Sequence, residues 1–148
     1  MKHISFLFIT SFFITVFCFP PSLGFTKNTP LQPVIEESYY EVKPENESMF
    51  LELHKTRVLP FWKEIKKRGL IEEDMKIYTQ RLHTLEPRWT FKTVVKFKNY
   101  TAIDKWLEIR EELFRELFPG EEYKELRNKI MRITERHWDV FLREIPLE

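Results

Sequence analysis

Residues 74–99, DMKIYTQRLHTLEPRWTFKTVVKFKN, predict two β-strands joined by a short turn. The turn is expected at Glu86-Pro87, because proline cannot donate to a strand ladder and the residue before it avoids helical geometry. The second strand has one plainly apolar face, and this face carries Trp89, Phe91, Thr93, Val95 and Phe97. We therefore expect this hairpin to form the middle of an antiparallel sheet.

The residues before the hairpin predict one strand and one long helix. Residues 38–43 alternate and are rich in β-forming side chains. Apolar side chains then recur near the helical period through residues 45–68, and Gly69 is the expected C-terminal stop. Pro60 lies inside this helix and should kink or split it, because its ring removes a backbone donor.

The residues after the hairpin predict two helices and a last strand. Thr101 is the expected N-cap of a helix that ends at Pro119-Gly120, and a further helical pattern covers residues 121–136. Residues 137–145 then form the last strand. This order is a βαββαβ unit with an inserted third helix, which predicts an α+β, ferredoxin-like fold with helices on one face of the sheet and an open face on the other.

The N-terminal residues 1–24 have the layout of a secretory signal peptide. A basic start is followed by a continuous apolar run, then by Pro-Pro and Ser-Leu-Gly, with cleavage expected after Gly24. The alternative is a membrane anchor, although the run is short for a bilayer core of about 30 Å. We expect residues 25–37 to be a linker, residues 38–148 to form the domain, and the protein to be secreted or periplasmic with no stable membrane span after cleavage.

Charge and cysteine content exclude several classes of function. The chain after Gly24 carries 23 basic and 23 acidic side chains, whereas a nucleic-acid-binding protein would show an excess of positive charge. The single cysteine, Cys18, lies within the signal, so a cleaved chain has neither disulfides nor thiol chemistry. The three histidines outside the signal lack the spacing of known metal sites, and we expect no metal and no cofactor.

Two segments resemble the dimeric α+β barrel superfamily, which includes NIPSNAP-like, EthD-like and antibiotic-biosynthesis-monooxygenase-like domains. The segments are VLPFWKEIKKRGLIEEDMKIYTQ at residues 58–80 and WTFKTVVKFKNYTAIDKWLEI at residues 89–109. The resemblance implies a homodimer in which two sheets pack face to face, with a small-molecule pocket near each sheet. The third helix exceeds the minimal pattern of the superfamily, and most members are cytosolic, unlike a chain with an export signal.

The candidate site residues come mainly from the hairpin. His83 is the candidate acid/base, because imidazole exchanges protons near neutral pH, while Tyr78 and Arg81 would orient a substrate. Glu41, Trp89 and Arg143 are candidate ligand-binding residues, and Asp139 is a further charged group of the last strand that could enter a cavity. The alternative is that the end of the hairpin is solvated and that these charges pair across the sheet surface.

Three functions are consistent with these patterns. The first is an exported dimeric barrel domain that binds a small apolar molecule, with or without catalysis. The second is an enzyme resembling the cofactor-independent oxygenases or isomerases, with His83 as the acid/base. The third is a protein-interaction module that uses the open sheet face. The sequence leaves open whether the protein is an enzyme.

Overall fold

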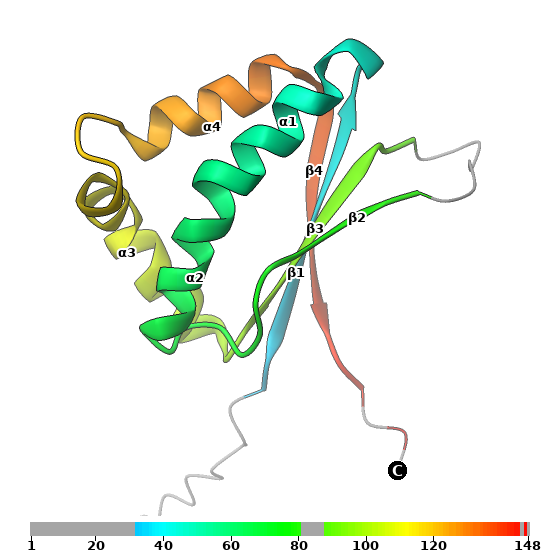
Figure 1. Cartoon of the computed structure of the whole chain (residues 1–148). Helices are drawn as coiled ribbons and strands as arrows, with labels where there is room; N and C mark the ends of the chain where they lie inside the picture. Colours follow the sequence, from blue (N-terminus) through cyan, green and yellow to red (C-terminus); the bar gives the residue numbers. More distant parts are fainter. Residues whose placement is uncertain (1–31, 81–87, 146, 148) are drawn as a thin grey trace, which may run out of the picture.

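The computed structural model describes residues 32–80, 88–145 and 147. They form a two-layer α+β fold in which all helices cover one face of a four-stranded antiparallel sheet (Figure 1). The strands are β1 (Val34–Val42), β2 (Lys76–Thr79), β3 (Phe91–Phe97) and β4 (Thr134–Arg143), in the spatial order β2-β3-β1-β4. The predicted ferredoxin-like fold is confirmed.

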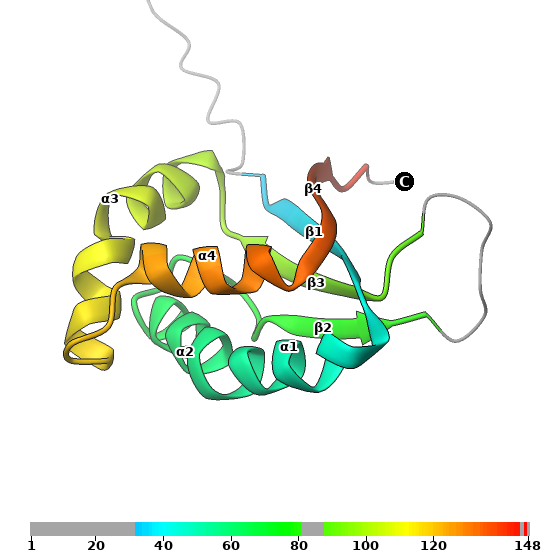
Figure 2. The ribbon, with the colours of Figure 1, turned by 90° about the horizontal axis from the view of Figure 1, so that it is seen from above.

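Three helical segments lie on the covered face (Figure 2). The first is nearly continuous and consists of η1 (Pro44–Asn46), α1 (Glu47–Leu53), the π-helical η2 (His54–Val58) and α2 (Leu59–Lys67). The others are α3 (Tyr100–Leu117) and α4 (Tyr123–Arg132). Gly69 ends the first segment with φ of 76°, a value that only glycine adopts without strain. None of the helices among the described residues is long and apolar enough to cross a membrane.

The core lies between the helices and the covered face of the sheet. The side chains of Phe91, Val95 and Phe97 on β3 are buried, as the apolar alternation predicts. Phenylalanine side chains from the helices meet them, and the most deeply buried large residues are Phe50, Phe61, Phe97, Phe114, Ile65 and Leu113. Burial of each such side chain contributes roughly 1.5–3 kcal/mol.

Three predicted boundaries are wrong. The last strand begins at Thr134 instead of residue 137, so the end of the helix predicted at residues 121–136 belongs to β4. The first strand begins at Val34 instead of residue 38, because Val34 is buried and pairs with Phe97, so the last four residues assigned to the linker belong to the sheet. The N-cap of α3 is Asn99 instead of Thr101, because the Asn99 side-chain oxygen accepts a hydrogen bond of 2.9 Å from the Ala102 amide.

The long helix is not sharply kinked at Pro60 but widens just before it. Proline has no N–H for the carbonyl of Thr56, four residues earlier, and the chain makes a π-type bond from Leu59 N to His54 O instead. The Thr56 carbonyl accepts a hydrogen bond of 3.2 Å from Arg57 Nη1. The predicted disruption therefore takes the form of a π-helical turn at residues 54–58.

Candidate functional site

A cavity of about 290 Å³ lies between the sheet and the helices. Its floor comes from the covered faces of β1, β3 and β4, and its walls come from the π-helical turn, α2, α3 and α4. Aromatic and aliphatic side chains form most of this lining, among them Phe61, Trp62 and Val95. A largely apolar cavity with a few polar groups is the usual form of a small-molecule site.

The central strand β1 contributes the polar floor of the cavity. Alternation along the strand places Glu36, Ser38 and Tyr40 on the covered face. The Glu36 Oε2 atom is fully buried and has no hydrogen-bond partner among the described residues. Desolvation and, to a lesser degree, the nearby charge of Asp139 raise the pKa of Glu36 to about 7. Glu36 therefore exchanges protons close to neutral pH.

Strand β4 places a histidine and a carboxylate beside Glu36. His137 Nε2 lies 3.1 Å from Asp139 Oδ1, and both residues line the cavity. Burial raises the pKa of Asp139, but hydrogen bonds from His137 and Ser38 outweigh this effect and hold it below its usual value. The Asp139 side chain is 39% exposed, so it marks the mouth of the cavity. Asp139 is thus ionised and already hydrogen-bonded, whereas Glu36 Oε2 has no partner among the described residues.

The π-helical turn brings a buried histidine to the cavity. His54 is 4% exposed, and its Nδ1 lies 2.9 Å from the carbonyl oxygen of Phe50. Because a carbonyl only accepts, Nδ1 carries the proton and Nε2 holds a lone pair. Burial lowers the pKa of His54 to about 4. His54 is therefore a neutral hydrogen-bonding group and not a charged one at physiological pH.

Helix α3 contributes two hydrogen-bond donors that have no partner within residues 32–80 and 88–145. Trp106 is 9% exposed, and its indole Nε1 has no hydrogen-bond partner among the described residues. One helical turn later, Arg110 Nε is buried and also lacks one; its nearest carboxylate oxygen, on Glu111, is 3.8 Å away. The guanidinium lies between two rings, 5.5 Å from the Trp106 centroid and 5.6 Å from that of Tyr123. Both donors are held in place by aromatic packing.

No group of three or more potential metal-binding side chains occurs within residues 32–80 and 88–145. The cavity histidines, His54 and His137, have other partners in Phe50 O and Asp139. The described part of the site thus offers proton exchange and hydrogen bonding.

The residues selected from the sequence lie mostly outside this cavity. Tyr78 and Glu41 are on the open face, which is the face of the sheet that the helices do not cover. On this face, Glu41 Oε2 lies 3.7 Å from Arg136 Nη1, and Tyr78 lies beside Lys92. Trp89 packs edge-on against Tyr39 of the same face, and Arg143 is exposed at the end of β4. Arg81 and His83 lie outside the described residues. The proposed roles of all six stay predictions.

Asp139 does line the cavity, as the sequence suggested for an inward charge on the last strand. Sequence reasoning missed Glu36, because the pair Glu36-Glu37 looked like the polar end of a linker. The usable signal was the alternation of Val34, Glu36, Ser38 and Tyr40, which places a carboxyl group between buried neighbours.

Comparison of the sequence with protein-family models and with curated proteins finds no match, whereas the fold matches solved structures. A NIPSNAP-like domain protein from Burkholderia xenovorans has a TM-score of 0.55 at 12% identity, over 80% of this chain and 90% of that one. A dimeric ferredoxin-like protein from an uncultured marine organism has a TM-score of 0.54 at 15% identity, over 81% of this chain and 94% of that one.

An antibiotic biosynthesis monooxygenase is also similar, with a TM-score of 0.51 at 13% identity over 77% of this chain and 99% of that one. These neighbours match the superfamily whose resemblance the sequence indicated. At such low identities the likeness establishes the shared ferredoxin-like fold.

Proposed function

We propose that this protein binds a small, largely apolar molecule in the cavity between its sheet and its helices. The observation that supports this best is the lining itself, which is rich in aromatic side chains and includes three residues with a buried polar atom that has no partner in the described part of the chain, namely Glu36, Trp106 and Arg110. A buried polar atom without a partner costs roughly 1–3 kcal/mol, and a ligand that supplies one recovers this free energy.

The test is calorimetric titration with 2-naphthol, an apolar molecule with one hydrogen-bonding group. We expect saturable binding at one site per chain. Val58→Trp, which places a larger side chain in the lining, should abolish binding, while Leu51→Trp, at an exposed position on the same helical segment, should not. Circular dichroism checks that both variants are folded. Equal binding by both variants would contradict a site in the cavity.

Proton-transfer catalysis is a second candidate, and the raised pKa of Glu36, about 7, favours it. In this candidate function, Glu36, which lines the cavity, acts as the acid/base. The sequence analysis assigned that role to His83. The assay follows exchange of the α-protons of phenylacetone in D2O by NMR. Faster exchange with the native protein, lost in Glu36→Gln, supports this candidate; exchange at the rate of buffer alone contradicts it.

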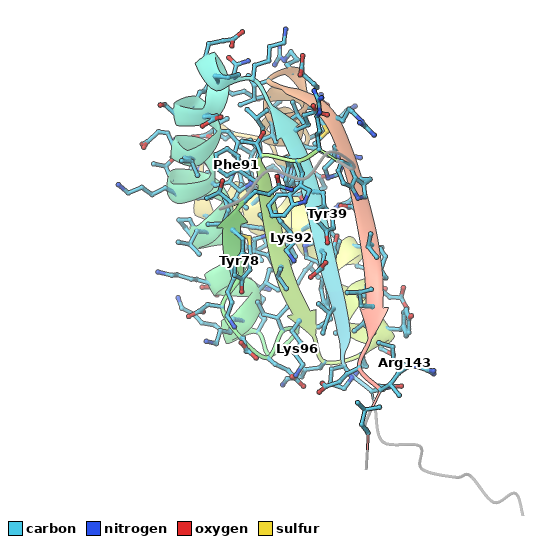
Figure 3. All side chains as sticks on the ribbon, turned by 90° about the vertical axis from the view of Figure 1, so that its right-hand side faces the viewer. Tyr39, Tyr78, Phe91, Lys92, Lys96 and Arg143 are labelled. Carbon is cyan, nitrogen blue, oxygen red and sulfur yellow. The ribbon has the colours of Figure 1, made fainter. Side chains whose placement is uncertain are left out.

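A homodimer formed through the open faces of two sheets is part of the proposal. Tyr39 lies on this face (Figure 3). Its ring stacks on that of Trp138, with ring centroids 5.1 Å apart. Charges on the face are neutralised within the chain, since Glu37 lies 2.9 Å from Lys92 and Lys96 lies 3.0 Å from Glu72. Paired charges lower the cost of burying the face against a second copy. The fold neighbour described as dimeric adds support.

We also propose that the protein is exported and cleaved after Gly24, as the signal pattern at residues 1–24 indicates. Expression of the full chain in a bacterium, followed by N-terminal sequencing of the protein from the periplasm or medium, tests this. Recovery of a chain that begins at Phe25 supports the proposal. Recovery of the intact chain in the membrane fraction contradicts it and favours an anchor.

A further inference from the structure

We propose that the ligand of this cavity is a small apolar carboxylate, whose carboxylate group is bound by Trp106 Nε1–H and Arg110 Nε–H on helix α3. This inference rests on the proposed function and adds the chemical class of the ligand. It follows from which polar atoms of the cavity have partners and which do not.

The unpartnered atoms on the helical side are donors only. Tryptophan Nε1 and arginine Nε each present an N–H and accept nothing, so only an acceptor on the ligand can satisfy them. They lie one helical turn apart on the same face of α3, where residues four apart are neighbours. A carboxylate has two acceptor oxygens, and hydrogen bonds to charged groups are the stronger ones.

The acceptors of the cavity have less need of a ligand. Asp139 accepts from His137 and Ser38, and the free nitrogen of His54 is neutral. The only unpartnered carboxyl oxygen that lines the cavity among the described residues is Glu36 Oε2. A carboxyl group in its protonated form is a donor, so it too matches a ligand acceptor.

The charge of the cavity also favours an anion. Two guanidinium groups, Arg110 on α3 and Arg127 on α4, line it. Among the described residues of the lining, the ionised Asp139 balances one of them when Glu36 is protonated, and Arg110 has only the more distant Glu111 carboxylate, outside the lining, with 3.8 Å between Arg110 Nε and Glu111 Oε1. The Arg110 side chain is 29% exposed while its Nε atom is buried, so the side chain extends from the solvent to the interior. An amine ligand would instead meet both cations and leave both α3 donors unsatisfied.

The experiment compares 2-naphthoate with 2-naphthamide, a neutral molecule of nearly the same shape, by calorimetric titration at pH 6. We expect the carboxylate to bind at least about tenfold more tightly, the factor set by one charge-assisted hydrogen bond. Trp106→Phe removes the indole N–H together with part of the ring volume and keeps an aromatic ring, and Arg110→Met removes the guanidinium but keeps an apolar stem. Each should reduce the carboxylate preference and leave the affinity for the amide nearly unchanged.

The matched control is Arg57→Met. Arg57 also holds its guanidinium over an aromatic ring, 5.0 Å from the Phe118 centroid, but lies outside the cavity. Loss of the Arg57 guanidinium should leave the preference for 2-naphthoate over 2-naphthamide unchanged. If both probes bind equally to the native protein, the carboxylate inference is overturned while the binding function stands. If neither probe binds, the proposed function fails and this inference fails with it.

Discussion

Glu36 lines the proposed binding cavity, and its protonation also affects the stability of the fold. Its pKa of about 7 in the folded chain lies above the ordinary value of 4.5, so the folded state favours the protonated form. The stability that this preference contributes is complete below pH 4.5 and is lost as the pH rises through 7. One pKa unit corresponds to about 1.4 kcal/mol, and after allowance for solvent around this partly exposed residue the effect is on the order of 2 kcal/mol.

Glu36→Gln should therefore stabilise the fold at pH 8 more than at pH 5, because an amide has no charge to desolvate. Urea unfolding of both proteins at the two pH values measures the difference. Glu112→Gln, at an exposed position of α3, serves as the control and should show no such change. If Glu36→Gln changes the unfolding free energy by the same amount at both pH values, burial does not shift the pKa of Glu36.

At the scale of single elements, the cap of α3 gives a second prediction. Asn99→Ala should cost about 1 kcal/mol of unfolding free energy, because the Ala102 amide loses its side-chain acceptor. Thr101→Ala should cost much less, since Thr101 is exposed and lies within the helix. Chemical denaturation of the two variants compares them directly. A larger loss of unfolding free energy for Thr101→Ala than for Asn99→Ala would show that Thr101 is the N-cap.

The π-helical turn gives a third prediction. Arg57 covers the Thr56 carbonyl that Pro60 leaves without a donor, and it also binds Glu121 with an Nε–Oε2 distance of 2.9 Å. Arg57→Ala should cost about 1–2 kcal/mol.

The loss should be smaller in a Pro60→Ala background, where residue 60 regains an N–H for that carbonyl. A double-mutant cycle with Arg57→Ala, Pro60→Ala and their combination measures this coupling. Strict additivity would show that the proline and the arginine act independently.

At the scale of the whole molecule, the open sheet face predicts the oligomeric state. Val94 lies on this face at the middle of β3, opposite Glu37. A new charge there would be buried without a partner in a dimer, at a cost of several kcal/mol. Val94→Glu should therefore convert a dimer into a folded monomer.

Leu107→Glu is the matched control, because Leu107 is exposed on α3 and away from the open face. Sedimentation equilibrium measures the mass of the native protein and of both variants. A native protein that stays monomeric at high concentration would contradict the dimer and would favour the alternative, in which the open face binds another polypeptide.

Local sequence patterns determined most of the fold. Alternation on β3, helical periodicity around Pro60 and Trp106, and the stop at Gly69 each depend on near neighbours in the chain, so they could be recognised directly. The strand–helix order that they define leads to one sheet with helices on one face. The boundary at Val34 was less predictable, because it depends on pairing with the distant Phe97. The cap of α3 was a choice between two nearby residues with suitable side chains, Asn99 and Thr101.

The site was decided by the tertiary structure. Glu36 is two residues before the predicted strand start and looked solvated in sequence, and only pairing with β4 and cover by α3 and α4 bury it beside Asp139. The loss of water around a side chain, and not its identity, moves its pKa and leaves its atoms without partners. The sequence by itself determined the elements and their order, whereas burial, a property of the assembled layers, selected the residues that can bind a ligand.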